Sequence, residues 1–503
     1  MENRIKQLRE GRLIPGKGIA FNTHRPRPVD YIQFDVASMV KGYQVGRKAN
    51  GEPYRYLIKT YGCQMNEHDT EMMAGLLQAM GYEPAEDVEV ADFILFNTCA
   101  VRENAEDKVF GEIGRLRPLK ATHPELILGL CGCMAQEKSV QAMVRDKFPW
   151  VDLVFGTHNI HRLPQLLTRA RNSQDTVMEV WDEAAATVEQ LPKLRKDRVR
   201  AWVNIQYGCN KFCTYCIVPY TRGAERSRRP EDIVAEVRQL AEEGFREVTL
   251  LGQNVNDYGV DLGDVTFATL LRQVNQVPGI ERIRFTTSNP WNFTDELMAA
   301  IAESEHVVEH IHLPVQSGNN QVLRRMNRTY TREYYLELVD KIRRAVPGVQ
   351  LTTDIIVGFP GETEAQFEDT LSLIEQVRFD NAFTFIYSPR ENTPATRFAD
   401  NVSLEEKKRR LQRLNEVQYR ISRELNERMV GQTVEVLVEG QSKTNASVLS
   451  GRTRGNKLVL FPGNPAWTGR LAQVEITEAK TWTLTGRLRS IEPAADTGQE
   501  ELA

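Results

Sequence analysis

Histidine is scarce in this chain of 503 residues, and none of the eight lies between His161 and His306. That gap contains three cysteines with the spacing C-x3-C-x2-C: Cys209, Cys213 and Cys216. A structural zinc site needs a fourth Cys or His, and no other cysteine lies within seventy residues on either side. A disulfide would leave one thiol over and is typical of secreted chains. The spacing therefore favours an open [4Fe–4S] cluster, with three irons on the loop and the fourth iron free, over zinc or three buried thiols.

Long apolar segments are also missing. No run of eighteen apolar residues occurs, and the first residues lack the apolar centre of a signal peptide. We therefore expect a cytoplasmic protein without a membrane partner. The 64 Lys and Arg nearly balance the 68 Asp and Glu, so a nucleic-acid-binding surface would have to be local. The sequence does not indicate the oligomeric state, for which a monomer is the default expectation.

The length allows three domains with extensions. Changes in composition predict a basic irregular extension at 1–54, an α/β domain at 55–172, a polar linker at 173–195, a second α/β domain at 196–427, a small β domain at 428–491 and an acidic tail at 492–503. The extension carries ten Lys or Arg against five Asp or Glu, which suits a solvated tail and an RNA-facing arm equally well. The acidic tail is expected to be disordered.

The first α/β domain alternates continuous apolar strands with helices, which predicts an open parallel sheet covered on both faces. The expected strands span 56–63, 91–99, 126–133 and 151–156. Three of them end in a cysteine: Cys63, Cys99, and either Cys131 or Cys133. Ligands bind beyond the carboxyl ends of such strands, so these thiols could converge on one site. The alternative is that they are small buried side chains.

The second α/β domain has six strand candidates, at 202–207, 247–254, 282–288, 310–316, 351–359 and 382–388. Six units predict a partial (β/α)6 barrel, open on one side to a large substrate, with its active residues at the carboxyl ends of the strands. An amphipathic helix over 405–429 follows. Short alternating strands over 428–490 then predict a small antiparallel β-barrel. Its nine Lys and Arg against four Glu suit a nucleic-acid platform.

Over 56–490 these features resemble the methylthiotransferase family of radical S-adenosylmethionine (SAM) enzymes, and in particular its tRNA-acting branch. The resemblance is carried by the stretches 61–66 (YGCQMN), 97–105 (NTCAVRENA), 132–136 (GCMAQ) and 217–228 (IVPYTRGAERSR). It implies that the small barrel is an RNA-binding TRAM domain. The chain departs from the family at Asn289, where His is usual, and at Asn392, where Gly is usual. Asn tolerates positive φ better than most residues, so the second departure is compatible with the same turn.

The resemblance also implies the roles of individual residues. Cys209, Cys213 and Cys216 would hold the cluster that cleaves SAM, and Cys63, Cys99 and Cys133 a second, sulfur-handling [4Fe–4S] cluster, with Cys131 a bystander. Residues that would contact SAM are Tyr215, Gln253, Asn254, Ser288, Gln316 and Asp354. Arginines suited to tRNA phosphates, or in the first four cases also to SAM's carboxylate, are Arg222, Arg226, Arg228, Arg229, Arg452 and Arg454. A solvated, salt-bridged loop is the alternative for the arginines beside the cluster.

The implied reaction explains why no acid–base dyad is evident, because the C2–H of an adenine is neither acidic nor easily attacked. The enzyme would convert N6-(dimethylallyl)adenosine at position 37 of the tRNA anticodon loop to its 2-methylthio derivative by hydrogen abstraction, sulfur insertion and S-methylation. Such a reaction uses two SAM per turnover, an external electron donor and a sulfur source. Alternatives are a family member acting on threonylcarbamoyl-adenosine tRNA or on a ribosomal protein aspartate, and a non-catalytic iron–sulfur RNA-binding regulator.

Overall fold

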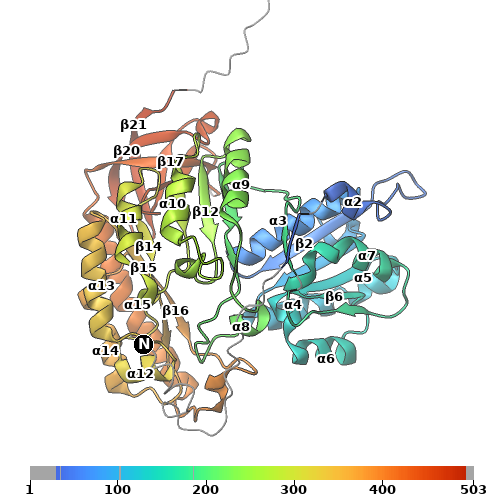
Figure 1. Cartoon of the computed structure of the whole chain (residues 1–503), viewed down its shortest axis with the longest axis horizontal. Coiled ribbons are helices and arrows are strands. Elements are labelled where there is room, and N and C mark those ends of the chain that lie inside the picture. Colours follow the sequence, from blue (N-terminus) through green and yellow to red (C-terminus); the bar gives the residue numbers. More distant parts are fainter. Residues whose placement is uncertain (1–29, 34, 101–102, 185, 444, 494–503) are drawn as a thin grey trace, which may run out of the picture.

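The computed structural model describes residues 30–33, 35–100, 103–184, 186–443 and 445–493. Figure 1 shows an N-terminal α/β domain beside a larger body, in which a small β-barrel sits at one end of a second α/β domain. Most of the basic extension, up to residue 29, and the acidic tail from residue 494 lie outside the described residues.

The N-terminal domain is built on a parallel six-stranded sheet with the order β3-β2-β4-β5-β6-β7. Its strands are β2 (Arg55–Tyr61), β3 (Glu83–Pro84), β4 (Phe93–Thr98), β5 (Ile127–Gly132), β6 (Leu153–Phe155) and β7 (Val177–Glu179). Helices cover both faces, so the central strands β4 and β5 are buried at every position. The main helices are α3 (Gln64–Ala79), α4 (Glu103–Arg115), α5 (Arg117–Thr122), α6 (Lys138–Lys147) and α7 (Leu163–Arg171). The predicted open parallel α/β domain is confirmed.

The extension and the linker contain more regular structure than the sequence predicted. Strand β7, at the start of the predicted linker, completes the main sheet. Strand β1 (Asp30–Gln33) pairs in parallel with β8 (Ala186–Glu189), and α2 (Val36–Val40) contacts α3. Elements of three to five residues carry too few positions for a hydrophobic period to be recognised. The pair of strands reaches the second domain, where the Tyr31 hydroxyl donates to the Ser227 carbonyl at 2.5 Å.

The second domain contains six parallel strands in two groups, β13-β12-β9 and β14-β15-β16, joined by a bridge between Ile283 and Val307. The strands are β9 (Arg200–Asn204), β12 (Glu247–Leu251), β13 (Arg282–Phe285), β14 (His310–His312), β15 (Gln350–Val357) and β16 (Asn381–Ile386). Their outer helices are α9 (Pro230–Glu242), α10 (Phe267–Asn275), α11 (Asp295–Glu303), α13 (Arg332–Ala345), α14 (Glu364–Val377) and α15 (Leu404–Glu427). Short elements near the strand ends are β10 (Gln206–Tyr207), β11 (Arg226–Ser227), α8 (Val218–Thr221) and α12 (Asn320–Arg325). The predicted partial barrel is confirmed.

The C-terminal domain is a closed five-stranded barrel with the order β17-β18-β19-β21-β20. Its strands are β17 (Thr433–Gln441), β18 (Val448–Thr453), β19 (Leu458–Pro462), β20 (Leu471–Ala479) and β21 (Thr483–Ile491). The pairing is antiparallel except between β19 and β21, which run parallel. Arg282, fully buried at the start of β13, donates to the Arg452 carbonyl at 2.6 Å and pairs with Glu435 at 2.9 Å. The small barrel is thus fixed to the amino ends of the core strands, away from the cysteine loop.

Candidate active site

The first cysteine group lies on the loop that follows β9 and β10, at the carboxyl ends of the core strands. The Cys209 amide donates to the Gly223 carbonyl at 3.1 Å, and the Cys216 amide donates to the Cys213 carbonyl at 2.9 Å. Gly208 has φ +73°, and a Cβ there would lie 2.1 Å from the Ala224 carbonyl oxygen. Only glycine fits this close approach, which sets the path of the loop into the first cysteine.

These thiols need positive charge beside them to act as ligands, because metals bind the thiolate. Burial raises the pKa of Cys209 well above its usual value and that of Cys216 to about 12. Arg328 supplies one cation, since its Nη1 donates to the Cys213 Sγ at 3.4 Å. The guanidinium is held by the Pro314 carbonyl at 2.8 Å. No motif pointed to Arg328, which lies 115 positions from Cys213 along the chain.

Buried polar atoms without partners lie at the loops after β12 and β13. They are the Asn254 Oδ1, the Ser288 Oγ and the Asn289 Oδ1, and both amide atoms of Gln206 lie unpaired on the strand just before the cysteine loop. An unpaired buried polar atom costs about 1–3 kcal/mol, so a polar ligand that pairs with these atoms stabilises the site. The amino, carboxylate and hydroxyl groups of SAM are of that kind, and these residues fit it.

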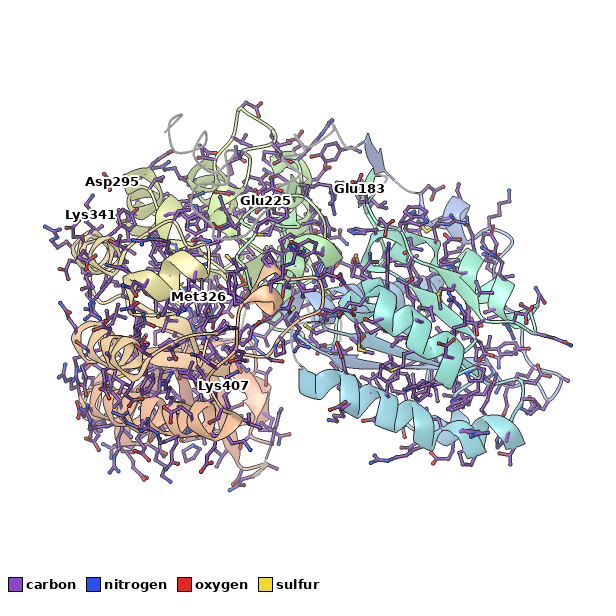
Figure 2. The ribbon with its side chains drawn as sticks, turned by 90° about the horizontal axis from the view of Figure 1, so that it is seen from below. Glu183, Glu225, Asp295, Met326, Lys341 and Lys407 are labelled. Atoms are coloured by element: carbon purple, nitrogen blue, oxygen red, sulfur yellow. The ribbon has the colours of Figure 1, made fainter. Side chains whose placement is uncertain are left out.

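Glu225 adds an ionisable group to this region. Burial, and then the charge of Asp257, raise the pKa of Glu225 to about 7, against the opposing charge of Lys211. Its Oε1 accepts from the Asn254 Nδ2 at 3.5 Å. Figure 2 places Glu225 on the part of the core that lies towards the N-terminal domain. Of the predicted SAM contacts, Gln253 lies beside Asn254, partly buried at the end of β12.

The other predicted SAM contacts come from the loop itself and from the second group of strands. Gln316, with φ +68°, donates its amide to the Asp354 carbonyl at 2.9 Å, which brings the ends of β14 and β15 together. Tyr215 packs against a cluster of buried side chains that includes Met326 and Phe359. The structure thus also gives Tyr215 a packing role, which anchors the loop on the barrel.

The second cysteine group follows three adjacent strands of the N-terminal sheet. Cys63 precedes α3, Cys99 follows β4, and Cys133 follows β5. A hydrogen bond with the Cys99 thiol, then the charge of Arg222, lower the pKa of Cys63 to about 6, against the effect of burial. This lowered pKa favours the Cys63 thiolate at neutral pH, which is the form of a thiol that binds a metal.

Cys131 and Cys133 have different surroundings although they are two positions apart. The Cys131 thiol is buried within β5 and contacts the Met73 sulfur at 3.6 Å, in the core under α3. The Cys133 sulfur accepts from the Arg222 Nε at 3.2 Å, at the end of the sheet where Cys63 and Cys99 lie. Cys131 therefore belongs to the hydrophobic core, and Cys133 lies with Cys63 and Cys99.

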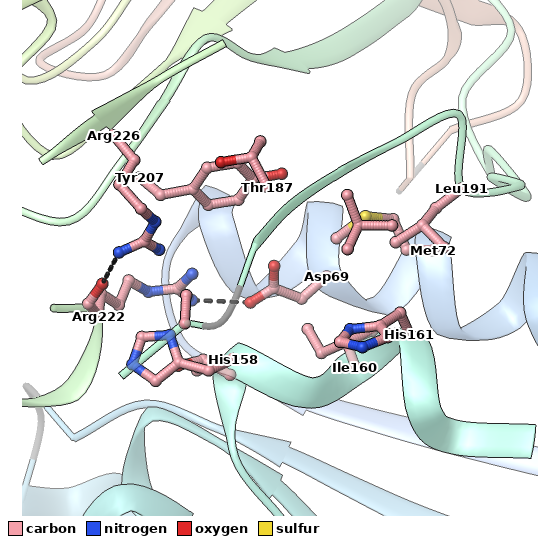
Figure 3. Close-up of a pocket in the computed structure, with 13 residues that line it drawn as sticks. Asp69, Met72, His158, Ile160, His161, Thr187, Leu191, Tyr207, Arg222 and Arg226 are labelled. Carbon is pink, nitrogen blue, oxygen red and sulfur yellow. Dashed lines mark hydrogen bonds and ion pairs between the residues drawn. The ribbon is translucent and has the colours of Figure 1, made fainter. Parts of the chain in front are cut away.

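Arg222 connects the two cysteine groups. It lies six positions after Cys216 and is buried, and its Nη2 pairs with Asp69 of α3 at 2.8 Å (Figure 3). A cavity of about 60 Å³ lies beside this pair, lined among others by His158, Arg226 and Tyr207. The segment that holds one cysteine group thus touches the other directly.

Most of the arginines predicted to contact phosphates also have protein partners. Arg222 and Arg228 are buried in ion pairs, Arg228 with Glu189 at 2.6 Å and with Glu236 at 2.8 Å. Arg226 is buried and donates to two backbone carbonyls, while Arg229 is exposed beside the Tyr31 ring.

The two arginines of the small barrel also have protein partners. Arg452 pairs with Glu439 at 3.2 Å, and Arg454 pairs with Glu309 of the core at 2.8 Å. These side chains stabilise the protein itself. Of the six arginines predicted to contact tRNA, Arg229 is therefore the one whose surroundings best suit an external phosphate.

Within the residues that the structure describes, no group of three or more His, Cys, Asp and Glu side chains is gathered as ligands of a single metal ion. A cubane cluster, by contrast, binds each cysteine to a different iron. None of the helices in the described ranges has the length and apolar character needed to cross a membrane.

Three family models match successive parts of the chain: uncharacterized protein family UPF0004 over 55–156, the radical SAM superfamily over 203–374 and the TRAM domain over 427–488. The chain is 58% identical to the tRNA-2-methylthio-N(6)-dimethylallyladenosine synthase of Geobacillus kaustophilus, over 92% of this chain and 86% of that protein. The enzyme of the same name from Geobacillus thermodenitrificans is also 58% identical, over 92% and 87%. The chain belongs to this family of synthases.

The family of radical SAM methylthiotransferases expected from the sequence motifs is thereby confirmed. Among solved structures, the radical SAM methyltransferase TsrM from Kitasatospora setae has a TM-score of 0.49 and 13% identity, over 79% of this chain and 80% of that chain. A likeness at that level is too remote to indicate a reaction.

Proposed function

We propose that this chain is a radical SAM methylthiotransferase that converts N6-(dimethylallyl)adenosine in the anticodon loop of tRNA to its 2-methylthio derivative. The observation that carries the proposal is that Arg222, six positions after the cysteine loop of the core, contacts Cys133 and Asp69 of the N-terminal domain. Membership of a family whose curated relatives bear the name of this activity supports the substrate.

Cys209, Cys213 and Cys216 would hold the first [4Fe–4S] cluster, with one iron left for SAM. When bound there, the cluster supplies the electron for one-electron cleavage of SAM, which begins hydrogen abstraction at C2. The chain's part is to place and shield these groups. Arg328 donates to the Cys213 sulfur and so orients it, and the unpaired Oδ1 of Asn254 would bind a polar group of SAM.

Cys63, Cys99 and Cys133 would hold a second cluster, which supplies an open iron for sulfur. Burial raises the pKa of the Cys133 thiol, and Arg222, which donates to its sulfur and is itself fixed by Asp69, opposes that rise. Because Arg222 belongs to the segment that follows Cys216, the two clusters would be held at a fixed separation. Such fixed geometry suits a reaction in which the activated carbon must meet sulfur before solvent or another group reaches it.

The partners follow from the reaction. Insertion of one sulfur and one methyl group requires two SAM per turnover, an external electron donor and a sulfur source. The TRAM barrel would bind the RNA through exposed basic side chains such as Arg487 on β21, which is 64% exposed although it pairs with Glu475. Arg229, exposed on the core itself, would add a separate contact. We expect the protein to act as a cytoplasmic monomer, where tRNA is available.

The test uses anaerobically reconstituted, reduced protein with SAM, a sulfide source and an anticodon stem-loop that carries N6-(dimethylallyl)adenosine. Mass spectrometry should find the 2-methylthio nucleoside and 5′-deoxyadenosine. Cys213→Ala should abolish SAM cleavage, and Cys99→Ala should retain some cleavage without sulfur insertion. Modification of a threonylcarbamoyl stem-loop instead would contradict the substrate, and the absence of SAM cleavage would favour a non-catalytic regulator.

A further inference from the structure

Two large apolar side chains are exposed on the last strand of the core. Phe383 and Phe385, on β16, are 51% and 40% exposed. Burial of an aromatic ring makes a large favourable contribution to the free energy of folding or binding. Two exposed rings on one strand therefore indicate a binding surface. We refer to this pair as the aromatic edge.

The register of the sheet places the aromatic edge on the inner face of the partial barrel. Phe383 is opposite Asp354, and Phe385 is opposite Ile356. Ile356 packs in the same cluster as Tyr215, which belongs to the cysteine loop. Because neighbours in register project from the same face, the two rings lie on the face that carries the loop.

The alternate residues of β16 confirm this orientation. Thr384 donates to the Asn415 side chain of the outer helix α15 at 2.7 Å, while Ala382 and Ile386 pack in the core between strands and helices. The outer face is therefore fully used in folding. The exposed rings on the inner face have no equivalent role.

Polar neighbours hold the first ring of the edge in place. The His312 ring lies edge-on to Phe383 at 5.8 Å between centroids. Its Nδ1 shares a hydrogen bond with the Thr352 hydroxyl at 2.9 Å, and its Nε2 lies 3.4 Å from an oxygen of Asp354. A fixed aromatic ring can stack on the face of a flat heterocycle, while neighbouring polar groups form hydrogen bonds with the edge of the heterocycle.

The aromatic edge also lies where a large molecule can reach it. β16 is the outermost strand of its group, so no further strand of the described chain covers it. The segment after it reaches the N-terminal domain, where Arg390 pairs with Glu106 of α4 at 3.8 Å. The edge thus adjoins the boundary at which the two cysteine groups meet.

We propose that Phe383 and Phe385 form the platform on which the extruded target base of the RNA stacks, together with its apolar N6 substituent. The inference rests on the proposed function and adds the residues that select the substrate. Enzymes that act on a base take it out of its stack and hold it against aromatic side chains. An apolar substituent adds area that only an apolar surface can bury favourably. SAM is a second source of an adenine ring, so the test must separate the two.

The test compares two stem-loops, one with N6-(dimethylallyl)adenosine and one with unmodified adenosine, for the parent, Phe383→Ala, Phe385→Ala and the double variant. Affinity for each RNA and affinity for SAM are measured separately. We expect the double variant to bind the prenylated RNA about 5- to 100-fold more weakly, and its preference over the unmodified RNA to fall towards unity. Phe383→Trp should restore much of the preference, which a purely structural defect would not allow.

Tyr334→Ala is the matched control, because Tyr334 is an aromatic residue, 41% exposed, on the outer helix α13. It should bind both RNAs as the parent does. Weaker SAM binding with an unchanged RNA preference would overturn the platform and assign the rings to the adenosyl group of SAM. Equal loss for both RNAs would overturn recognition of the substituent. A parent protein that neither binds nor modifies the prenylated RNA would contradict both the proposed function and the platform. An active parent, with variants that bind the prenylated RNA as tightly as the parent does, would contradict the platform alone.

Discussion

At the scale of single residues, the site is defined by the side chains that contact the cysteine sulfurs. Arg328 donates to Cys213, and Arg222 donates to Cys133. Both arginines are buried and reach sulfur from distant parts of the chain, at separations of 115 and 89 positions. Each cysteine group therefore has one sulfur in contact with a buried cation from outside its own motif.

Cys131 and Cys133 provide a direct test of the second cysteine group. Cys133→Ala should lower the iron content of the reconstituted protein from about eight to about four atoms per chain, because one [4Fe–4S] cluster loses a ligand. Cys131→Ala is the matched control and should keep the full iron content, since its thiol contacts Met73 in the core. Iron analysis and the visible absorption of the clusters measure both. Loss of iron in Cys131→Ala with retention in Cys133→Ala would reverse the assignment.

Arg328 provides the second test at this scale. Arg328→Met removes the donor to Cys213 and the shorter of two hydrogen bonds to the Pro314 carbonyl, which keeps only the Tyr330 hydroxyl at 3.3 Å; the loss costs about 1–3 kcal/mol of folding free energy. We expect a lower unfolding midpoint and weaker retention of the first cluster. Arg328→Lys keeps the charge but not the planar geometry, so its unfolding midpoint and cluster retention should lie between those of the parent and Arg328→Met. Unchanged stability and iron content in both variants would show that Arg328 has no such role.

At the scale of elements, the turns before the cysteines matter as much as the strands. The loop of the first group begins with Gly208, whose φ of +73° and contact with Ala224 exclude any side chain. The strands themselves could be predicted from sequence, because β4, β5 and β12 are apolar over most of their length. The short strands β1 and β8 could not, since their pairing is formed between segments about 150 positions apart.

Gly208→Ala tests the turn. The added Cβ would meet the Ala224 carbonyl, so we expect destabilisation well above the ~1–2 kcal/mol of a positive φ alone, with loss of the first cluster. Gly244→Ala is the control, because Gly244 has φ +90° but nothing lies within 4 Å of its added Cβ. Denaturant unfolding of both variants separates steric overlap from backbone strain. Similar losses in the two proteins would contradict the packing argument.

At the scale of the whole molecule, three domains meet around one core. The N-terminal domain is fixed through Arg222 and through the buried pair of Arg228 with Glu189. The TRAM barrel is fixed through Arg282 at the opposite ends of the strands. Changes in composition and in strand pattern allowed the fold of each domain to be predicted from sequence, and cysteine spacing predicted two groups of three cysteines. The roles of these arginines could not be predicted, because a motif gives their spacing but not whether they face solvent or another domain.

Arg282→Met tests the attachment of the barrel. Arg282 is fully buried and donates to backbone and carboxylate of the TRAM domain, so its loss should weaken the contact by about 1–3 kcal/mol. We expect proteolysis near the end of α15 to become faster and RNA affinity to fall, while SAM cleavage without RNA persists. Arg272→Met, at an exposed ion pair on α10, should show neither change. Identical proteolysis of the two variants would show that Arg282 does not hold the barrel in place.

The central claim is that this chain places sulfur and a methyl group on a prenylated tRNA adenosine. Its most direct test is mass spectrometry of nucleosides from bulk tRNA of a strain that lacks the gene, with the gene restored as control. We predict that the strain without the gene loses 2-methylthio-N6-(dimethylallyl)adenosine and accumulates N6-(dimethylallyl)adenosine. Persistence of the methylthiolated nucleoside, with loss of the methylthio group from the threonylcarbamoyl derivative instead, would contradict the proposed substrate.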